Sequence, residues 1–127
     1  MAASDYLEIA LLDHVLRNTA LTSPTVVYLG LSTGSFNDDN SGTELSGNGY
    51  ARQTITCSAA ASGSITNSSA ISFPTATGTW GDISHFGVFD ASSSGNLLFH
   101  GALSPTKNIT SGDVLKIDAS GLTITLD

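Results

Sequence analysis

The sequence comprises 127 residues with a formal net charge of −7, and only 12% of its residues are charged. A chain of this length can fold as one domain over residues 1–127 and bury roughly two-thirds of the surface that it exposes when unfolded. Its 40% of hydrophobic residues exclude a disordered tail, and its acidic balance argues against nucleic acid or an anionic membrane surface as a partner.

Residues 6–16 are apolar but are interrupted by Glu8, Asp13 and His14, and no basic segment precedes them. This pattern does not fit a signal peptide, and no run reaches the ~18 apolar residues of a membrane-spanning helix. We therefore expect a protein that is made in the cytoplasm and has no membrane partner.

Residues 5–17 are predicted to form the only substantial helix. Asp5 is expected to cap its N-terminus, with Glu8 as its partner in a capping box. The apolar stripe is broad, with one row formed by Leu7, Leu11, His14 and Val15 and a second row formed by Ile9, Leu12 and Leu16. Two arrangements stay open: the helix packs into its own sandwich, or part of it packs on another subunit.

Short runs of β-forming residues follow, separated by Gly, Pro, Ser and Asn. Strands are predicted at residues 25–33, 50–57, 64–67, 70–73, 83–89, 97–103, 114–118 and 122–127. Their number and spacing favour a mainly β fold, an antiparallel β-sandwich over residues 25–127 with about seven to nine short strands and one N-terminal α-helix. The single cysteine, Cys57, rules out an internal disulfide and is expected to be buried in a strand.

Residues 83–89 and 97–103 are expected to form a hairpin across the polar connection at 90–96. Trp80, the only tryptophan, lies just before this hairpin and next to Gly81. We predict that this region forms the centre of the core, and that residues 104–110 are a connector.

The segment over residues 34–49 is long, polar and rich in glycine, which predicts an exposed loop that can carry contacts. Its Asn37-Asp38-Asp39-Asn40 run offers oxygen ligands for calcium. The spacing differs from that of an EF-hand, however, and no glutamate closes the run at the twelfth position. A solvated loop tip is therefore expected instead of a calcium site.

Motifs for catalysis or cofactor binding are absent from the sequence. His85 and His100 could meet across the hairpin, but no third ligand has the right spacing, so hydrogen-bonded histidines are expected instead of a metal site. The chain also has no G-x-S-x-G motif. These observations predict a protein that is not an enzyme and binds no cofactor.

Several short motifs occur in a recognisable order along the chain. They are Tyr28-Leu29-Gly30-Leu31, Gly42-Thr43-Glu44, Gly49-Tyr50-Ala51-Arg52-Gln53, Phe73-Pro74-Thr75-Ala76-Thr77, Trp80-Gly81, Phe86-Gly87-Val88-Phe89-Asp90-Ala91 and Gly95-Asn96-Leu97-Leu98. In this order they resemble a family of small virion proteins of tailed bacteriophages, whose members are often labelled tail fibre proteins. The resemblance covers nearly the whole chain and implies a structural component of the virion.

The resemblance leaves the position in the particle open. The chain is short and has no internal repeat, which favours a capsid decoration, or cement, protein that binds the major capsid protein. The alternative is a tail fibre, tail-tip or baseplate component whose loops contact a host glycan, with Phe36 or Tyr50 as a stacking platform. In both cases we expect a homo-oligomer, a dimer or a trimer, in contact with other virion proteins. The residues expected at these contacts are Leu7, Leu11, Val15, Phe36, Asp38, Asp39 and Tyr50.

Overall fold

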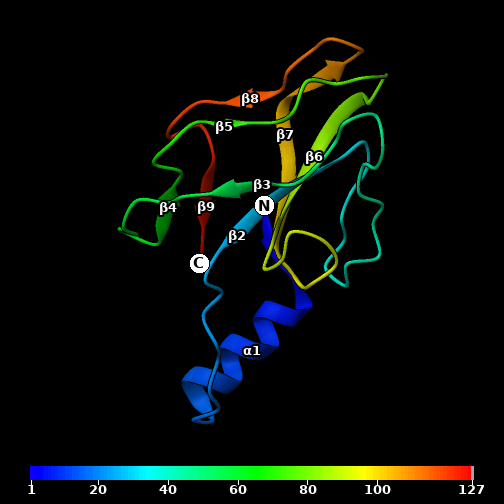
Figure 1. Ribbon diagram of the computed structural model, residues 1–127. Helices are drawn as coiled ribbons and strands as arrows, with labels where there is room; N and C mark the ends of the chain where they lie inside the picture. Colours follow the sequence, from blue (N-terminus) through cyan, green and yellow to red (C-terminus); the bar gives the residue numbers. More distant parts are fainter. Residues whose placement is uncertain (127) are drawn as a thin grey trace.

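The computed structural model describes residues 1–126 and is mainly β, with one N-terminal helix and antiparallel sheets, as predicted (Figure 1). The elements of residues 1–126 are, in order, β1 (Ala2–Ala3), α1 (Asp5–Leu16), β2 (Val27–Ser32), β3 (Gln53–Ile55), β4 (Ser64–Thr66), β5 (Ile71–Ser72), β6 (Gly81–Phe89), β7 (Leu97–Ile109), β8 (Lys116–Ile117) and β9 (Thr123–Thr125). Most strands are shorter than predicted, and Asp127, the last residue of the predicted strand at 122–127, lies outside the described residues.

The largest sheet has five strands in the order β1-β7-β6-β2-β3, and every neighbouring pair in it is antiparallel. Two small sheets, β4-β9 and β5-β8, form a second layer over one face of this sheet (Figure 1). The arrangement is sandwich-like, and it places the N-terminal strand β1 at an edge beside β7. Strand β1 was not predicted, because two alanines carry no strand pattern.

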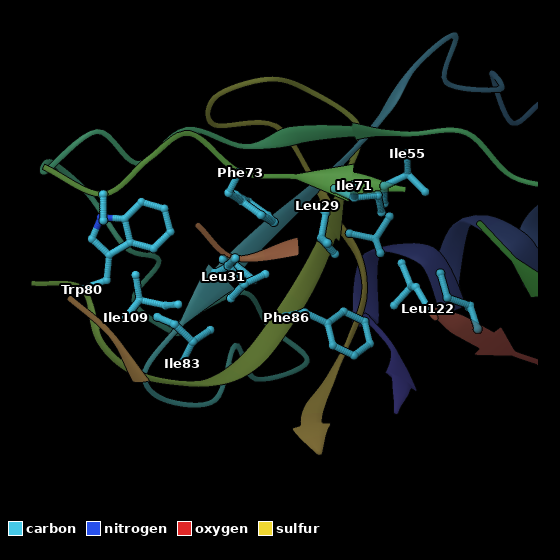
Figure 2. Close-up of a cluster of buried hydrophobic side chains, with 14 of the residues drawn as sticks. Leu29, Leu31, Ile55, Ile71, Phe73, Trp80, Ile83, Phe86, Ile109 and Leu122 are labelled. Atoms are coloured by element: carbon cyan, nitrogen blue, oxygen red, sulfur yellow. The ribbon is translucent and has the colours of Figure 1, made fainter. Parts of the chain in front are cut away.

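The hydrophobic core lies between the two layers (Figure 2). Leu29 and Leu31 on β2 are fully buried and point to the same face of the sheet, as the period of two in a strand requires, while Gly30 and Ser32 lie on the opposite face and are buried as well. The second layer, strand β3 and the β6–β7 hairpin with its flanking segments supply the remaining side chains: Ile55, Ile71, Phe73, Ala76, Trp80, Ile83, Phe86, Val88, Leu98, Ile109, Leu115, Leu122 and Ile124. Trp80 lies in this core as predicted, and its indole N–H donates a 2.9 Å hydrogen bond to the carbonyl of Asn48.

Strand β7 continues through the region predicted to be a connector and ends only at Ile109. The prediction of a break at residues 104–110 was wrong because Pro105 falls where the pairing with β6 is already interrupted. The partners on either side of the irregularity are Ile83 with Lys107 and His85 with Ala102, so several residues of β7 oppose Ser84. A proline removes no ladder hydrogen bond from such a bulge.

Asn67 is a buried polar residue that joins three segments of the second layer. Its side-chain amide donates 2.9 Å hydrogen bonds to the carbonyls of Ser69 and Asp118, and its side-chain oxygen accepts a 2.9 Å bond from the amide of Leu122. The residue is only 1% exposed. This single side chain therefore takes the place of a longer strand ladder, since β4, β5, β8 and β9 have only two or three residues each.

The predicted burial of Cys57 was wrong, because Cys57 is exposed. Strand β3 ends at the buried Ile55, two residues earlier, so the alternation that would have turned Cys57 inward is lost. Cys57 instead forms an isolated bridge with Asn67, and partial burial raises the pKa of its thiol.

Replacing Asn67 with Ala should lower the free energy of unfolding by about 2–4 kcal/mol, because it leaves three backbone groups near the core without their partner. Urea denaturation followed by tryptophan fluorescence measures the change. The exposed neighbour Ser69 provides the control, and Ser69→Ala should change stability by less than about 0.5 kcal/mol. Equal effects of the two variants would contradict the role given to Asn67.

Candidate functional site

Helix α1 begins at a buried cap that fastens it to strand β7. The predicted N-cap, Asp5, is wrong, because the N-cap is Ser4. The Ser4 hydroxyl accepts a 3.2 Å hydrogen bond from the amide of Leu7 and donates to the carbonyl of Leu97. The amide of Ser4 also donates a 2.9 Å bond to the carbonyl of Leu98. Ser4 is 1% exposed, so the first turn of the helix is fixed to the sheet.

No residue of α1 is buried, and the helix extends away from the β layers (Figure 1). Leu7 and Leu11 are half-buried, whereas Val15 is 66% exposed. The second row is equally open, with exposed fractions of 63% for Ile9, 59% for Leu12 and 74% for Leu16. In the described structure the helix therefore packs on its own sandwich through the Leu7–Leu11 row, and the rest of the predicted stripe is exposed.

The loop over residues 34–49 is anchored at two points and is not simply solvated. Phe36 is 1% exposed and packs edge-on against Phe89, with 5.6 Å between ring centroids. Its ring therefore cannot serve as the predicted stacking platform. The loop folds back so closely that a Cβ at Gly42 would lie 2.2 Å from the carbonyl oxygen of Ser35, which only glycine avoids.

The tip of this loop lies beside the start of α1. The amide of Asp5 donates a 3.0 Å hydrogen bond to the carbonyl of Asp38, and the Asp38 carboxylate lies 2.6 Å from Nε2 of His100. Asp39 is exposed, and hydrogen bonds from Ser41 lower the pKa of its carboxyl group. The structure thus brings Asp38 and Asp39 next to the helix, so two of the regions predicted to make contacts form one continuous surface.

The two hairpin histidines do not meet. His85 opposes Ala102 and His100 opposes Gly87 in the observed register. Nδ1 of His85 lies 2.8 Å from the hydroxyl oxygen of Ser84, and His100 approaches Asp38. Within residues 1–126 no group of three or more His, Cys, Asp or Glu side chains is placed to hold a metal ion.

The second anchor of the loop is an ion pair between Glu44 and Arg52. Both oxygens of the Glu44 carboxylate accept hydrogen bonds from the guanidinium group, at 2.8 and 2.9 Å. The remaining guanidinium nitrogen donates to the carbonyls of Ala91 and Ser94, at 2.7 and 2.8 Å. The guanidinium group also lies 3.6 Å from the centroid of the Phe89 ring. Arg52 therefore ties the loop at 34–49 to the hairpin connection at 90–96.

Tyr50 completes this arrangement and is not available as a glycan platform. Its hydroxyl donates to Glu44 and accepts a 3.0 Å hydrogen bond from the amide of Leu31, while its ring stacks on Phe73. Strand β2 leaves room for the cluster only because residue 30 is glycine: a Cβ there would lie 2.8 Å from a Glu44 oxygen.

Sequence analysis missed the partnership of Glu44 and Arg52, although both residues lie in the quoted motifs. Their signal is an acidic and a basic residue in glycine-containing segments of a chain with few charges.

No helix described in residues 1–126 is long and apolar enough to cross a membrane.

Replacing Glu44 with Gln should lower the free energy of unfolding by about 3–5 kcal/mol, because the Arg52 side chain, only 6% exposed, loses its counter-charge. Thermal denaturation followed by circular dichroism measures this loss. The control is Asp13→Asn, which breaks the exposed pair between Asp13 and Arg17 and should cost less than about 1 kcal/mol. If Glu44→Gln is as stable as Asp13→Asn, the ion pair does not anchor the loop.

Stability should fall at high pH through Tyr50. Burial, followed by the hydrogen bond to Glu44, raises the pKa of Tyr50 well above its ordinary value of 10.0. Stability is then unaffected below pH 10 and falls above it by up to about 1.4 kcal/mol per pH unit, because the unfolded chain loses the phenolic proton first. Comparing denaturation of wild type and Tyr50→Phe on both sides of pH 10 isolates this component. In the control Tyr6→Phe, the free energy of unfolding should fall with pH as steeply as in the wild type. If it also falls as steeply in Tyr50→Phe, Tyr50 is not the source of the pH dependence.

Residues 2–125 match the family model described as Podophage GP4 fiber I protein gp80. No curated protein matches the chain. The family match spans nearly all of the described residues and confirms the resemblance to small virion proteins of tailed phages. The chain therefore belongs to the Podophage GP4 fiber I protein gp80 family and is a structural protein of the phage virion.

Proposed function

We propose that this protein is a subunit of a phage tail fibre and that helix α1 attaches it to the rest of the particle. The observation that carries this proposal is the exposure of Ile9, Leu12, Val15 and Leu16, each at least 59% exposed. An apolar surface that stays open in an isolated subunit of a virion protein is typical of an assembly contact. The fibre description of the family supports the tail as the location.

The β layers supply the rigid part of such a subunit. Loops of a fibre domain have to keep their shape when they meet a host surface, and here the loop at 34–49 is fixed by the Glu44–Arg52 pair and by buried Phe36. This role requires shape and attachment but no chemical step. We therefore propose a protein that acts without catalysis and whose partners are other virion proteins.

Capsid decoration is the second candidate, and one structural observation favours it. Residues 1–126 contain no repeated structural unit that could stack into a fibre shaft. A small sandwich with one exposed apolar helix also suits a protein that covers a joint between capsid subunits. Many copies on a shell would make even a small contact effective through avidity.

Gold-labelled antibodies against the purified protein, imaged on intact particles by electron microscopy, distinguish the two candidates. The fibre proposal expects label on the tail, and antibody preabsorbed with the protein should leave the particles unlabelled. Label spread over the head would replace the fibre with the decoration protein. Particles without label, in preparations where the major capsid protein is labelled by its own antibody, would contradict both.

A further inference from the structure

The outward face of α1 has the residue spacing of a helix that inserts into a groove. Ile9, Leu12 and Leu16 stand at positions i, i+3 and i+7, which lie in one row along a helix. All three are exposed to 59% or more, and Leu7 and Leu11 on the opposite side already face the β layers. The outer row, which we call the Ile9 face, is thus a second apolar surface with no cover within residues 1–126.

Acidic side chains border the Ile9 face on both sides. Glu8 precedes Ile9 and Asp13 follows Leu12, so they take the flanking positions that set partner choice when helices pair. Asp5 lies four residues before Ile9, at the N-terminal end of the same row. Asp5 and Glu8 lie in the first turn, where negative charges interact favourably with the helix dipole. These carboxylates therefore stabilise the helix as well as bordering the Ile9 face.

The acidic border continues onto the loop at 34–49. Asp38 and Asp39 line a polar pocket together with Asp5, and Asp39 is exposed. Basic groups nearby are few: His100 lines the same pocket, with its Nε2 2.6 Å from the Asp38 carboxylate, and Arg17 lies on the helix. Arg17 forms a 3.2 Å pair with Asp13, but its side chain is 72% exposed, so the pair is weak and easily exchanged for another partner. The surface around the Ile9 face is therefore predominantly negative.

This charge pattern disfavours a second copy of the chain as the occupant. If two α1 helices met in parallel along the Ile9 face, Glu8 of one would approach Asp13 of the other. If they met antiparallel with Leu12 at the centre, the two Asp13 side chains would approach each other, and Glu8 of each copy would lie beside Val15 of the other. Both arrangements place like charges at the rim of a short apolar seam, and the net charge of −7 on each copy adds to the repulsion.

We propose that the Ile9 face inserts into an apolar groove rimmed by lysine or arginine on a different virion protein. Apolar burial by Ile9, Leu12 and Leu16 supplies the attraction, and the acidic border selects the basic rim and rejects a second copy. This inference rests on the proposed function, in which α1 attaches the subunit to the particle, and it adds the chemistry of the surface that receives it.

Two synthetic helical peptides test the proposal against the full-length protein. They share the same apolar a and d positions, and one carries Lys at every e and g position whereas the other carries Glu. Fluorescence anisotropy at about 0.05 M salt should show at least about tenfold tighter binding of the Lys peptide, and the ratio should fall at about 0.5 M salt, where exposed charges are screened. Leu12→Asp should weaken binding of the Lys peptide at least about tenfold, since one anchor of the seam is lost.

Matched variants separate the groove-type contact from general attraction between a basic peptide and an acidic protein. General attraction would be strengthened by the added charge of Leu12→Asp, whereas the proposal expects a loss. Val114→Asp adds the same charge at another exposed apolar residue, 50% exposed and outside α1, and should leave Lys-peptide binding unchanged. The double variant Glu8→Lys/Asp13→Lys should reverse the preference between the two peptides.

The proposal is overturned if both peptides bind equally, if neither binds, or if light scattering finds an oligomer of the wild type that Leu12→Asp dissolves. The last result would make the Ile9 face a contact between copies. The peptide experiment tests the basic groove, and the labelling experiment tests the location in the particle, so each can give a negative result without the other. Selective binding with unlabelled particles would refute the virion location, and labelled particles with no peptide preference would refute only the basic groove.

Discussion

The bidentate pair between Glu44 and Arg52 is the interaction on which the organisation of this molecule depends. The Arg52 side chain is only 6% exposed, so its guanidinium group needs hydrogen-bond acceptors within the protein. Each of its three nitrogens donates at least one hydrogen bond, to the Glu44 carboxylate or to the carbonyls of Ala91 and Ser94. These partners come from segments that are distant in the sequence. The two long loops beside the main sheet are thereby held in one arrangement, with the Phe89 ring beneath the charge.

The segments that carry the family resemblance converge on this pair. The glycine of the Tyr28–Leu31 motif makes room for it, Glu44 and Arg52 form it, and Phe89 lies against it. The motifs thus describe a structural cluster. This explains why the resemblance identifies the fold and the class of protein while naming no functional site, and why the contact surface has to be found from exposure and charge instead.

The class of fold could be predicted from the sequence because it depends on local patterns. The helix over 5–17 and the alternation at Leu29 and Leu31 are visible in any window of a few residues, and the burial of Trp80 follows from its size and setting. Interactions between distant segments could not be predicted in the same way. Cys57 is exposed because β3 ends before it. Strand β7 continues beyond Pro105 because this residue lies in a bulge. Ser4 instead of Asp5 is the N-cap because its hydroxyl can also donate to the carbonyl of Leu97 in β7.

The position of the helix illustrates the same limit for the candidate site. The two apolar rows of α1 were apparent in the sequence, but periodicity alone does not say which row faces the body. The buried cap at Ser4 fixes the rotation of the helix, directing Leu7 and Leu11 inward and leaving the Ile9 face open. Asp38 and Asp39 were expected at a contact, and their closeness to α1 follows from one backbone hydrogen bond that joins Asp5 to Asp38.

An apolar helix face that remains uncovered is a hazard while free subunits accumulate before assembly. Isolated copies at high concentration would stick together through such a face unless something kept them apart. The acidic border around Ile9, Leu12 and Leu16 provides that protection, because two approaching copies repel each other at the place where they would adhere. On the proposed attachment, the carboxylates that select a basic partner would thus also hold unassembled copies apart.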